Sequence, residues 1–169
     1  MPTPLDDLVR HNAWANQQVI TCCRGLGEAT LNAPLPGTYG PIIDTLRHSI
    51  DSEMSYLARL LAVEPTYLWP RGEAVGIAVL AERVAVLATA WEHFLASGVD
   101  LERRMTAYGD DPKVYTVPIG VVLAQAIHHG SEHRAQICTI LGALGHQPPD
   151  VSAWGYGFAS GRSVIEEYE

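Results

Sequence analysis

Four segments, each at least about 20 residues long, carry the periodicity of amphipathic helices, and glycine and proline residues separate them. They span about residues 3–23, 41–63, 73–96 and 118–144. In the third segment, apolar residues recur at steps of three and four, which aligns them along one side of a helix; these residues are Ile77, Leu80, Val84, Leu87, Trp91 and Phe94. Four such helices can bury their apolar faces against one another. The sequence therefore predicts an all-α fold, a four-helix bundle.

Short signals indicate where these helices begin and end. Thr3 is suited to cap the first helix, with Pro4 at its first position and Asp6 completing a variant of the capping box. Pro65 disfavours helical geometry at the residue before it, which ends the second helix. Gly145 ends the fourth. We expect the helices to extend close to these residues.

Two connections between the helices are long, over residues 26–40 and 101–117. Their length permits crossover loops rather than a simple up-and-down order. Within the second connection, the turn-forming residues 109–112 separate two short segments that could be extended. The sequence therefore predicts a hairpin there, although a two-stranded hairpin is marginal by itself.

The chain has 169 residues, enough for one hydrophobic core without disulfides or structural metals. We expect a single domain over residues 1–169, with a helical core at about residues 3–145. Residues 146–169 form a tail that contains aromatic residues among glycines. These aromatic side chains could dock on the bundle, line a pocket or join a dimer, and we expect the tail to pack on the bundle.

Composition excludes several classes of partner. The net charge is −8, with 19 acidic residues against 11 basic ones, which disfavours binding to nucleic acid or to an anionic membrane. No apolar run approaches the roughly 18 residues of a spanning helix, and the N-terminus lacks the pattern of a secretory signal. The three cysteines, two of them adjacent, form no C-x-x-C motif and resemble reduced thiols. We expect a cytoplasmic protein.

Two of the seven histidines, His129 and His133, lie four residues apart on the fourth helix. At about 100° per residue they share the face that should point into the bundle, so they could bind one metal ion. Buried histidines bonded to carboxylates or carbonyls would give the same pattern, and the residues alone leave both interpretations open. The motif differs from that of zinc proteases, because Gly130 follows His129 and Glu132 points away from His133.

A third metal ligand should come from another helix, and the candidates are His48, His11 and His93. His93 lies opposite the apolar stripe of its helix, and His11 carries no special signal. The apolar stripe of the second helix lies nearly opposite His48, which favours a solvated face; the wall of a polar cleft is the alternative. The residues that share the His48 face are Asp44, Asp51, Ser52, Ser55 and Arg59.

Three motifs resemble those of the DinB/YfiT-like family. Residues 11–16, HNAWAN, resemble the Trp-Ala-Asn signature of that family's first helix. Residues 46–53, LRHSIDSE, resemble its second-helix motif of a leucine, a histidine and later acidic residues. Residues 129–137, HGSEHRAQI, resemble the H-x-x-x-H-R-G-Q-I motif of its last core helix. The order and spacing of the three agree over about residues 6–144.

The resemblance implies a four-helix bundle, commonly a homodimer, that holds a divalent ion through three histidines. In this sequence they are His48, His129 and His133, and zinc or nickel is favoured, with iron and other ions as further options. Ala135 replaces the usual glycine, and Glu132 stands where many members carry another histidine. Both departures would change contacts around a metal rather than remove a ligand.

Family members with known activities include transferases that use bacillithiol or mycothiol, so the resemblance favours a metal-dependent S-transferase. Its partners would be a low-molecular-weight thiol and a small-molecule substrate. A hydrolase that uses a metal-bound water and a non-catalytic, stress-related metal-binding protein are the alternatives. A plain structural bundle, whose histidines are core or surface residues, also remains open. The candidate pocket or supporting residues are Trp14, Asp51, Ser52, Ser55, Arg59, Glu132 and Gln136.

Overall fold

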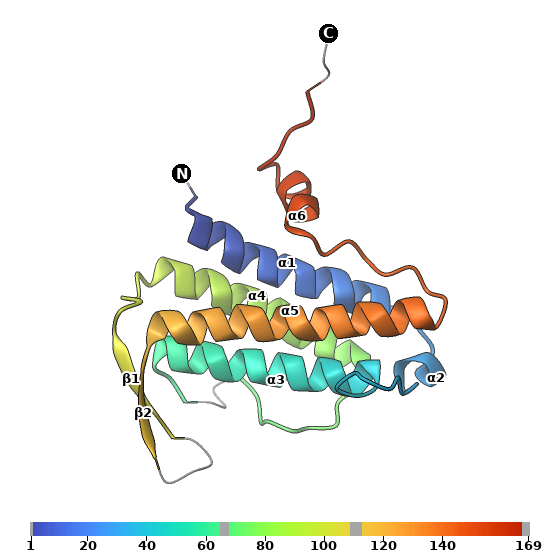
Figure 1. Ribbon diagram of the computed structural model, residues 1–169, viewed down its shortest axis with the longest axis horizontal. Helices are drawn as coiled ribbons and strands as arrows, with labels where there is room; N and C mark the ends of the chain where they lie inside the picture. Colours follow the sequence, from blue (N-terminus) through green and yellow to red (C-terminus); the bar gives the residue numbers. More distant parts are fainter. Residues whose placement is uncertain (1, 65–67, 109–112, 167–169) are drawn as a thin grey trace.

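The structure is a computed structural model that describes residues 2–64, 68–108 and 113–166. Four long helices form a bundle, and two short helices and a hairpin join them (Figure 1). The predicted all-α four-helix bundle is confirmed. The elements are α1 (Pro4–Arg24), α2 (Glu28–Leu31), α3 (Ile42–Leu61), α4 (Ile77–Ala96), β1 (Arg104–Tyr108), β2 (Val114–Pro118), α5 (Ile119–Ala143) and α6 (Ala153–Ala159).

In the bundle, α1 and α3 each pack against both α4 and α5. Figure 1 shows α3 and α4 pointing the same way, while α1 and α5 point the opposite way. The connection between α3 and α4 therefore runs along the length of the bundle. The sequence instead indicated residues 26–40 and 101–117 as the connections long enough for a crossover. The second of these contains the antiparallel pair β1–β2, in which Arg104 faces Pro118, and its turn at 109–112 lies outside the described residues.

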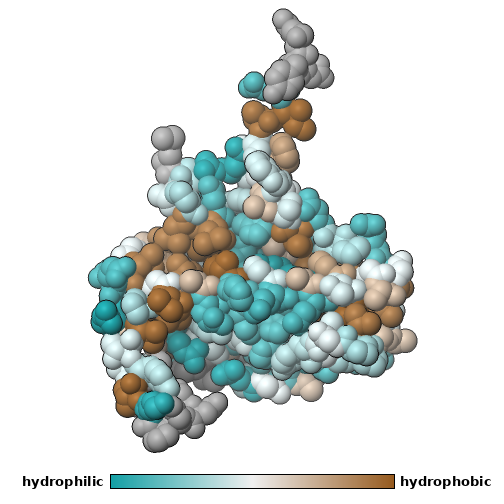
Figure 2. All heavy atoms as spheres, in the orientation of Figure 1, coloured by the Kyte–Doolittle hydropathy of each residue, from teal (hydrophilic) through white to brown (hydrophobic). Residues whose placement is uncertain are grey.

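The core consists of apolar side chains from all four long helices. Fully burying one large aliphatic side chain contributes about 1.5–3 kcal/mol relative to leaving it exposed. The largest fully buried side chains are Trp91, Ile20, Ile42, Met54, Leu57, Leu60, Leu80, Leu87, Ile119, Ile137, Ile140 and Leu141. On the surface, hydrophilic side chains cover the middle of α5, and hydrophobic ones gather near the N-terminal ends of α1 and α5 (Figure 2).

Local signals explain most helix ends. The Thr3 hydroxyl accepts a hydrogen bond from the Asp6 amide at 3.3 Å, and the Asp6 carboxylate accepts one from the Thr3 amide at 2.6 Å, which is the predicted capping box. One start was misplaced: α4 begins at Ile77, not near Glu73. Residues 73–76 are held outside the helix because Glu73 forms an ion pair with Arg83 and the Val75 carbonyl accepts a hydrogen bond from Arg47.

The C-terminal tail contains a short helix, α6, that the sequence did not predict. The Ser152 hydroxyl caps it by accepting a hydrogen bond from the Gly155 amide at 3.0 Å. The tail packs on α1, where His11 Nε2 lies 2.8 Å from the Val151 carbonyl oxygen and Arg162 pairs with Asp7. Across the described residues, no helix combines the length and apolar content needed to cross a membrane.

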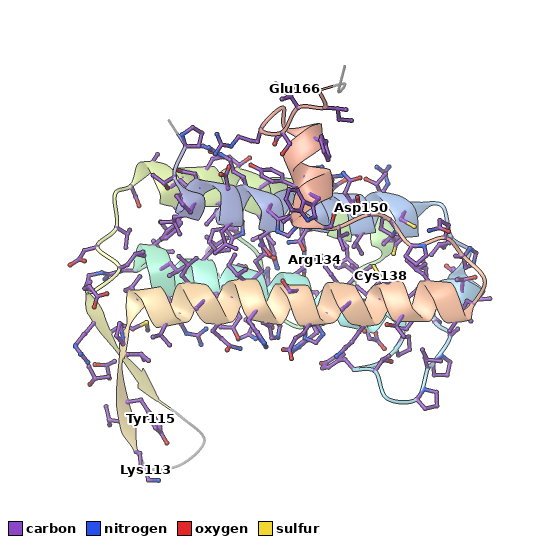
Figure 3. All side chains as sticks on the ribbon, turned by 45° about the horizontal axis from the view of Figure 1, so that its top comes forward. Lys113, Tyr115, Arg134, Cys138, Asp150 and Glu166 are labelled. Carbon is purple, nitrogen blue, oxygen red and sulfur yellow. The ribbon has the colours of Figure 1, made fainter. Side chains whose placement is uncertain are left out.

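A buried polar network joins the centres of α1, α3, α4 and α5. The Glu53 carboxylate accepts hydrogen bonds from Asn12 at 3.1 Å, Asn16 at 2.7 Å and the Trp91 indole at 2.5 Å. Arg134 reaches from α5 toward α1 and donates to the amide oxygens of the same two asparagines, at 2.8 and 2.7 Å (Figure 3). Two asparagines thus bridge a buried carboxylate and a buried guanidinium, which satisfies polar atoms that would otherwise be costly to bury.

Candidate metal centre

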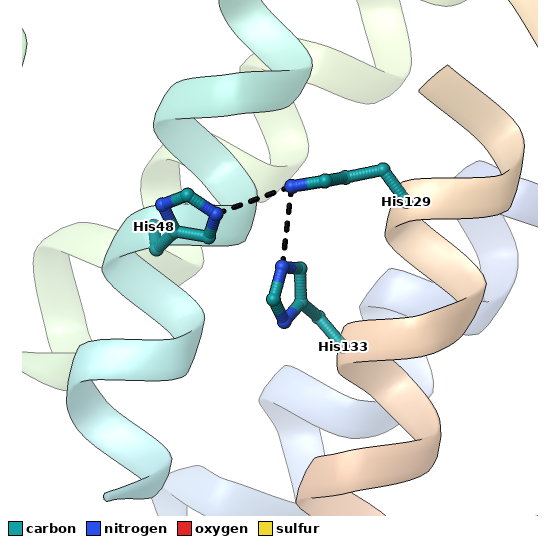
Figure 4. A group of neighbouring side chains, drawn as sticks. All are labelled: His48, His129 and His133. Atoms are coloured by element: carbon teal, nitrogen blue, oxygen red, sulfur yellow. Dashed lines mark hydrogen bonds between the residues drawn. The ribbon is translucent and has the colours of Figure 1, made fainter. Parts of the chain in front are cut away.

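Three imidazole rings from two helices converge on one point between α3 and α5 (Figure 4). Helix α3 supplies His48, and α5 supplies His129 and His133, one turn apart. His129 Nε2 lies 3.1 Å from His48 Nε2 and 3.2 Å from His133 Nε2. The potential ligand atoms of the three residues all lie within 4.8 Å of one another. The three histidines could therefore hold one divalent ion.

The two nitrogen separations about His129 fit a shared cation. Imidazole nitrogens bind zinc at about 2.0–2.1 Å, so two neighbouring ones on one ion lie about 2.8–3.4 Å apart in octahedral or tetrahedral arrangements. The observed separations of 3.1 and 3.2 Å fall within that interval. A neutral ring nitrogen has either one hydrogen or one lone pair, so His129 Nε2 cannot make two good hydrogen bonds to its neighbours. A cation would satisfy all three lone pairs.

A hydrogen bond to Gln136 assigns the tautomer of His133. His133 Nδ1 lies 3.3 Å from the Gln136 side-chain oxygen, which only accepts, so Nδ1 carries the hydrogen. The Nε2 lone pair of His133 is then available to a metal. The same Gln136 oxygen also accepts a hydrogen bond from the Tyr39 amide at 3.1 Å. Gln136 thus links the ring of His133 to the segment before α3, as supporting residues of metal sites do.

Aromatic rings restrict the three imidazoles. Tyr39 stacks on His48 with ring centroids 4.2 Å apart, and it meets His133 edge-on at 5.3 Å. Tyr56 lies edge-on against His129 at 5.7 Å. Rings packed in this way lose rotational freedom before a metal arrives, which lowers the entropic cost of binding.

The surroundings favour the neutral forms of His129 and His48. Burial, followed by the charges of His133 and His48, lowers the pKa of His129 to about 4. Burial also lowers the pKa of His48, with a further contribution from His133. Neutral rings have free lone pairs at pH 7, which is the state that metal ligation requires.

A protein-family model gives this arrangement its context. The model described as the DinB family matches residues 1–163 of the chain. The chain belongs to the DinB family. No curated protein gives a significant match. The family assignment agrees with the resemblance of the three sequence motifs and with the helical fold.

The middle of the polar face of α3 in this DinB-family chain is covered, whereas Asp44 and Arg59 at its two ends are exposed. Asp51 is 8% exposed, Ser52 9% and Ser55 3%. Residues 68–75 follow α3 and bury this face: the Asp51 carboxylate accepts hydrogen bonds from the Trp69 indole and the Gly72 amide. The solvated-face interpretation favoured by the local pattern is therefore wrong for the middle of the face, and His48 lies at the edge of a polar cavity.

The other sequence candidates occupy varied places. Gln136 contacts His133, whereas Glu132 is exposed and pairs with His128 at 3.3 Å. The Trp14 ring lies against His11 and Tyr156, beside α6.

Two remaining candidates lie farther along α3. The Ser55 hydroxyl donates to the Asp51 carbonyl at 3.0 Å. The exposed Arg59 lies over the Tyr56 ring at 5.8 Å. They support the helix and the tyrosine beside His129.

Several residues at the centre were not found from the sequence: Tyr39, Tyr56, Trp69 and Arg71. Three of them lie in irregular segments, where no periodicity relates a side chain to a face of the fold. The only available signal was composition, an aromatic residue within a loop rich in proline and glycine.

The position between the two ligand-bearing turns of α5 requires a glycine. A Cβ on Gly130 would lie 2.9 Å from Arg134 Nη1 and 3.0 Å from Asn12 Oδ1, two atoms of the buried network. We expect Gly130→Ala to destabilise the protein by about 1–3 kcal/mol, because displacing a buried charged network outweighs the gain in helix propensity. Urea denaturation measures the change.

Gly142→Ala on the same helix is the matched control. Its added Cβ would meet only Pro148 Cγ, at 4.0 Å. We expect this variant to be as stable as the wild type or up to about 1 kcal/mol more stable. Equal stability of the two alanine variants would contradict the steric account of Gly130.

Proposed function

We propose that this DinB-family chain is a divalent-metal-dependent S-transferase that uses a low-molecular-weight thiol. One observation carries the proposal: three imidazoles converge beside an open cavity of about 800 Å³ that His48 helps to line. Among the described residues, the group contains no carboxylate or cysteine. Catalytic zinc sites commonly use three protein ligands and leave a further position for substrate, whereas structural sites are closed by four.

The residues have distinct roles in this proposal. His48, His129 and His133 would hold the ion, and zinc or nickel suits their nitrogens. A thiol bound there beside a divalent ion would have a lowered pKa and would be a strong nucleophile at neutral pH. Tyr39 and Gln136 keep the rings oriented, and the cavity beside His48 receives the substrate. The thiol sulfur bonds to the electrophilic carbon, the leaving group departs with the bonding electrons, and the thiol proton passes to water.

A panel of cellular thiols tests the activity. Metal-loaded wild type is mixed with bacillithiol, mycothiol or glutathione and an electrophilic acceptor, and thiol consumption is followed. We expect at least one thiol to react about 100-fold faster than in the His129→Ala variant. His128→Ala is the matched control, since this neighbouring side chain is exposed and should leave the rate unchanged.

The other outcomes separate the alternatives. If the wild type consumes every thiol of the panel no faster than His129→Ala does, the transferase proposal fails and a non-catalytic metal-binding protein is indicated. Cleavage of ester substrates without any thiol would instead indicate a hydrolase.

We also propose that the chain acts as a homodimer in the cytoplasm, where reduced small thiols are available. Two features support a second copy as partner: Leu8 and Trp154 are exposed and line one cavity between α1 and α6, and Val164 and Ile165 are exposed in the tail. Light scattering after gel filtration should give twice the mass of the chain. A monomer at micromolar concentration would contradict this part of the proposal.

A further inference from the structure

The cavity beside His48 is lined mainly by charged side chains from two segments. Helix α3 contributes one side, and residues 71–74, which precede α4, contribute the other. The charged residues are Asp44, Arg47, Asp51, Arg71 and Glu73.

All three acidic residues of the cavity already have an arginine partner. Asp44 lies 2.8 Å from Arg47, and Asp51 lies 3.4 Å from Arg83. Glu73 also pairs with Arg83. The three carboxylates share two arginines, Arg47 and Arg83, so each carboxylate is paired but one negative charge of the group is left over.

Arg71 differs from these residues. Within the described ranges 2–64, 68–108 and 113–166, no carboxylate lies within 4.0 Å of its guanidinium. Its side chain is exposed and lines the cavity together with His48. Among the described residues, the cavity thus presents a guanidinium without an ion-pair partner beside the candidate metal centre.

Asp51 holds the Trp69 side chain before Arg71 and the Gly72 backbone after it. Its carboxylate accepts a hydrogen bond from the Trp69 indole at 2.9 Å and another from the Gly72 amide at 2.8 Å. The Arg83 guanidinium lies over the Trp69 ring at 4.9 Å, which holds the indole from its other side. We call Asp51, Trp69 and Gly72 the Asp51 clamp. Because the clamp restrains the segment that carries Arg71, less conformational entropy is lost when a ligand contacts Arg71.

We propose that Arg71 binds a carboxylate group of the ligand whose thiol reaches the three-histidine centre, and that the Asp51 clamp positions Arg71 for this contact. The inference rests on the proposed function and names the substrate class, a carboxylate-bearing small thiol. Arginine binds carboxylates through two parallel hydrogen bonds. One carboxylate suits the paired donors of this one guanidinium, whereas the second charge of a phosphate would add repulsion from Asp44, Asp51 and Glu73, which line the same cavity.

Two thiols of equal length test the contact. Binding of 3-mercaptopropionate and of its neutral analogue 3-mercapto-1-propanol to the zinc-loaded protein is measured by calorimetry. We expect the wild type to bind the carboxylate about tenfold more tightly, and Arg71→Gln to remove this preference. The affinity of Arg71→Gln for the neutral thiol and its zinc content should equal those of the wild type. A preference retained within twofold in Arg71→Gln, or absent from the wild type, would overturn the assignment.

A further experiment distinguishes failure of the proposed thiol chemistry from failure of the Arg71 site. If neither thiol binds, the proposed function fails, and succinate replaces them as probe on the same zinc-loaded protein. Any binding of succinate to the ion alone is equal in the wild type and in Arg71→Gln, so tighter binding by the wild type still supports Arg71. Equal or undetectable binding in both proteins would overturn the Arg71 site as well.

Asp51→Asn tests the clamp. One oxygen becomes an amide nitrogen, which cannot accept from either Trp69 or Gly72. We expect the variant to lose the preference for the carboxylate while its zinc content and its affinity for the neutral thiol stay unchanged. Asp51→Glu, which keeps two acceptor oxygens, should restore part of the preference. An unaltered preference in Asp51→Asn would show that the clamp does not position Arg71.

Discussion

Replacing His129 with alanine is expected to reduce bound divalent metal from about one equivalent per chain to less than a tenth of that amount. His129 Nε2 is the central atom of the group, because it lies 3.1 and 3.2 Å from the corresponding nitrogens of His48 and His133. Without the His129 imidazole, only His48 on α3 and His133 on α5 remain as ligands, and the nitrogen that lies between theirs is lost. Losing even a supporting contact costs 10–100-fold in metal affinity, so losing this ligand should cost about 100-fold or more.

Elemental analysis of protein prepared without a polyhistidine tag measures the metal content. His128→Ala is the control, because its exposed imidazole faces Glu132 on the outer side of the same helix. That variant should retain the metal content of the wild type. A full equivalent of metal in His129→Ala would contradict the assignment of this residue as a ligand.

The Arg134→Met variant is expected to show the largest loss of stability, about 3–5 kcal/mol. Arg134 is 4% exposed, and through Asn12 and Asn16 it faces the fully buried carboxylate of Glu53. Without the guanidinium, that carboxylate has no buried positive charge to compensate it, and the two asparagine oxygens lose their donor. Urea denaturation at pH 7 gives the free energy of unfolding.

The loss of stability in Arg134→Met should increase with pH. Burial raises the pKa of Glu53 above its ordinary value of 4.5, and the Trp91 hydrogen bond and the Arg134 charge oppose the rise. Removing Arg134 raises this pKa further. Because the buried group then favours its protonated form, the deficit relative to wild type should be smallest below about pH 4.5 and should grow as pH rises through the raised pKa.

Two comparisons isolate the buried charge. Arg10→Met removes a cation from an exposed pair with Glu92, and such surface pairs contribute about 0–1 kcal/mol. Adding Glu53→Gln to Arg134→Met removes the uncompensated charge and should restore part of the stability at pH 7. A loss for Arg134→Met as small as that for Arg10→Met would contradict the role given to the network.

The helices could be predicted from the sequence because their signals are local. The capping box of Thr3 and Asp6 set the start of α1, and the apolar stripe from Leu80 to Phe94 identified α4. The start of α4 was misplaced because contacts with distant residues, not a local signal, hold Glu73 and Val75 outside the helix. Helix α6 is seven residues long, too short for a periodic pattern to identify it.

The candidate centre was only partly predictable. The spacing of His129 and His133 placed them on one face of α5. The face that carries His48 has the polar composition of a solvated surface, and only the resemblance to DinB-family motifs singled His48 out. Residues 68–75 return along α3 and cover that face. The local sequence pattern of α3 does not depend on such a contact, so it could not predict it. Arg71 escaped prediction for the same reason.

The central claim is that three imidazoles from two helices hold one divalent ion. X-ray absorption spectroscopy of the untagged, zinc-loaded protein tests it most directly. We expect one ion per chain with three imidazole nitrogens at about 2.0–2.1 Å and a further position open to an exogenous ligand. Failure to load an ion, or a shell with fewer than three imidazoles, would contradict it.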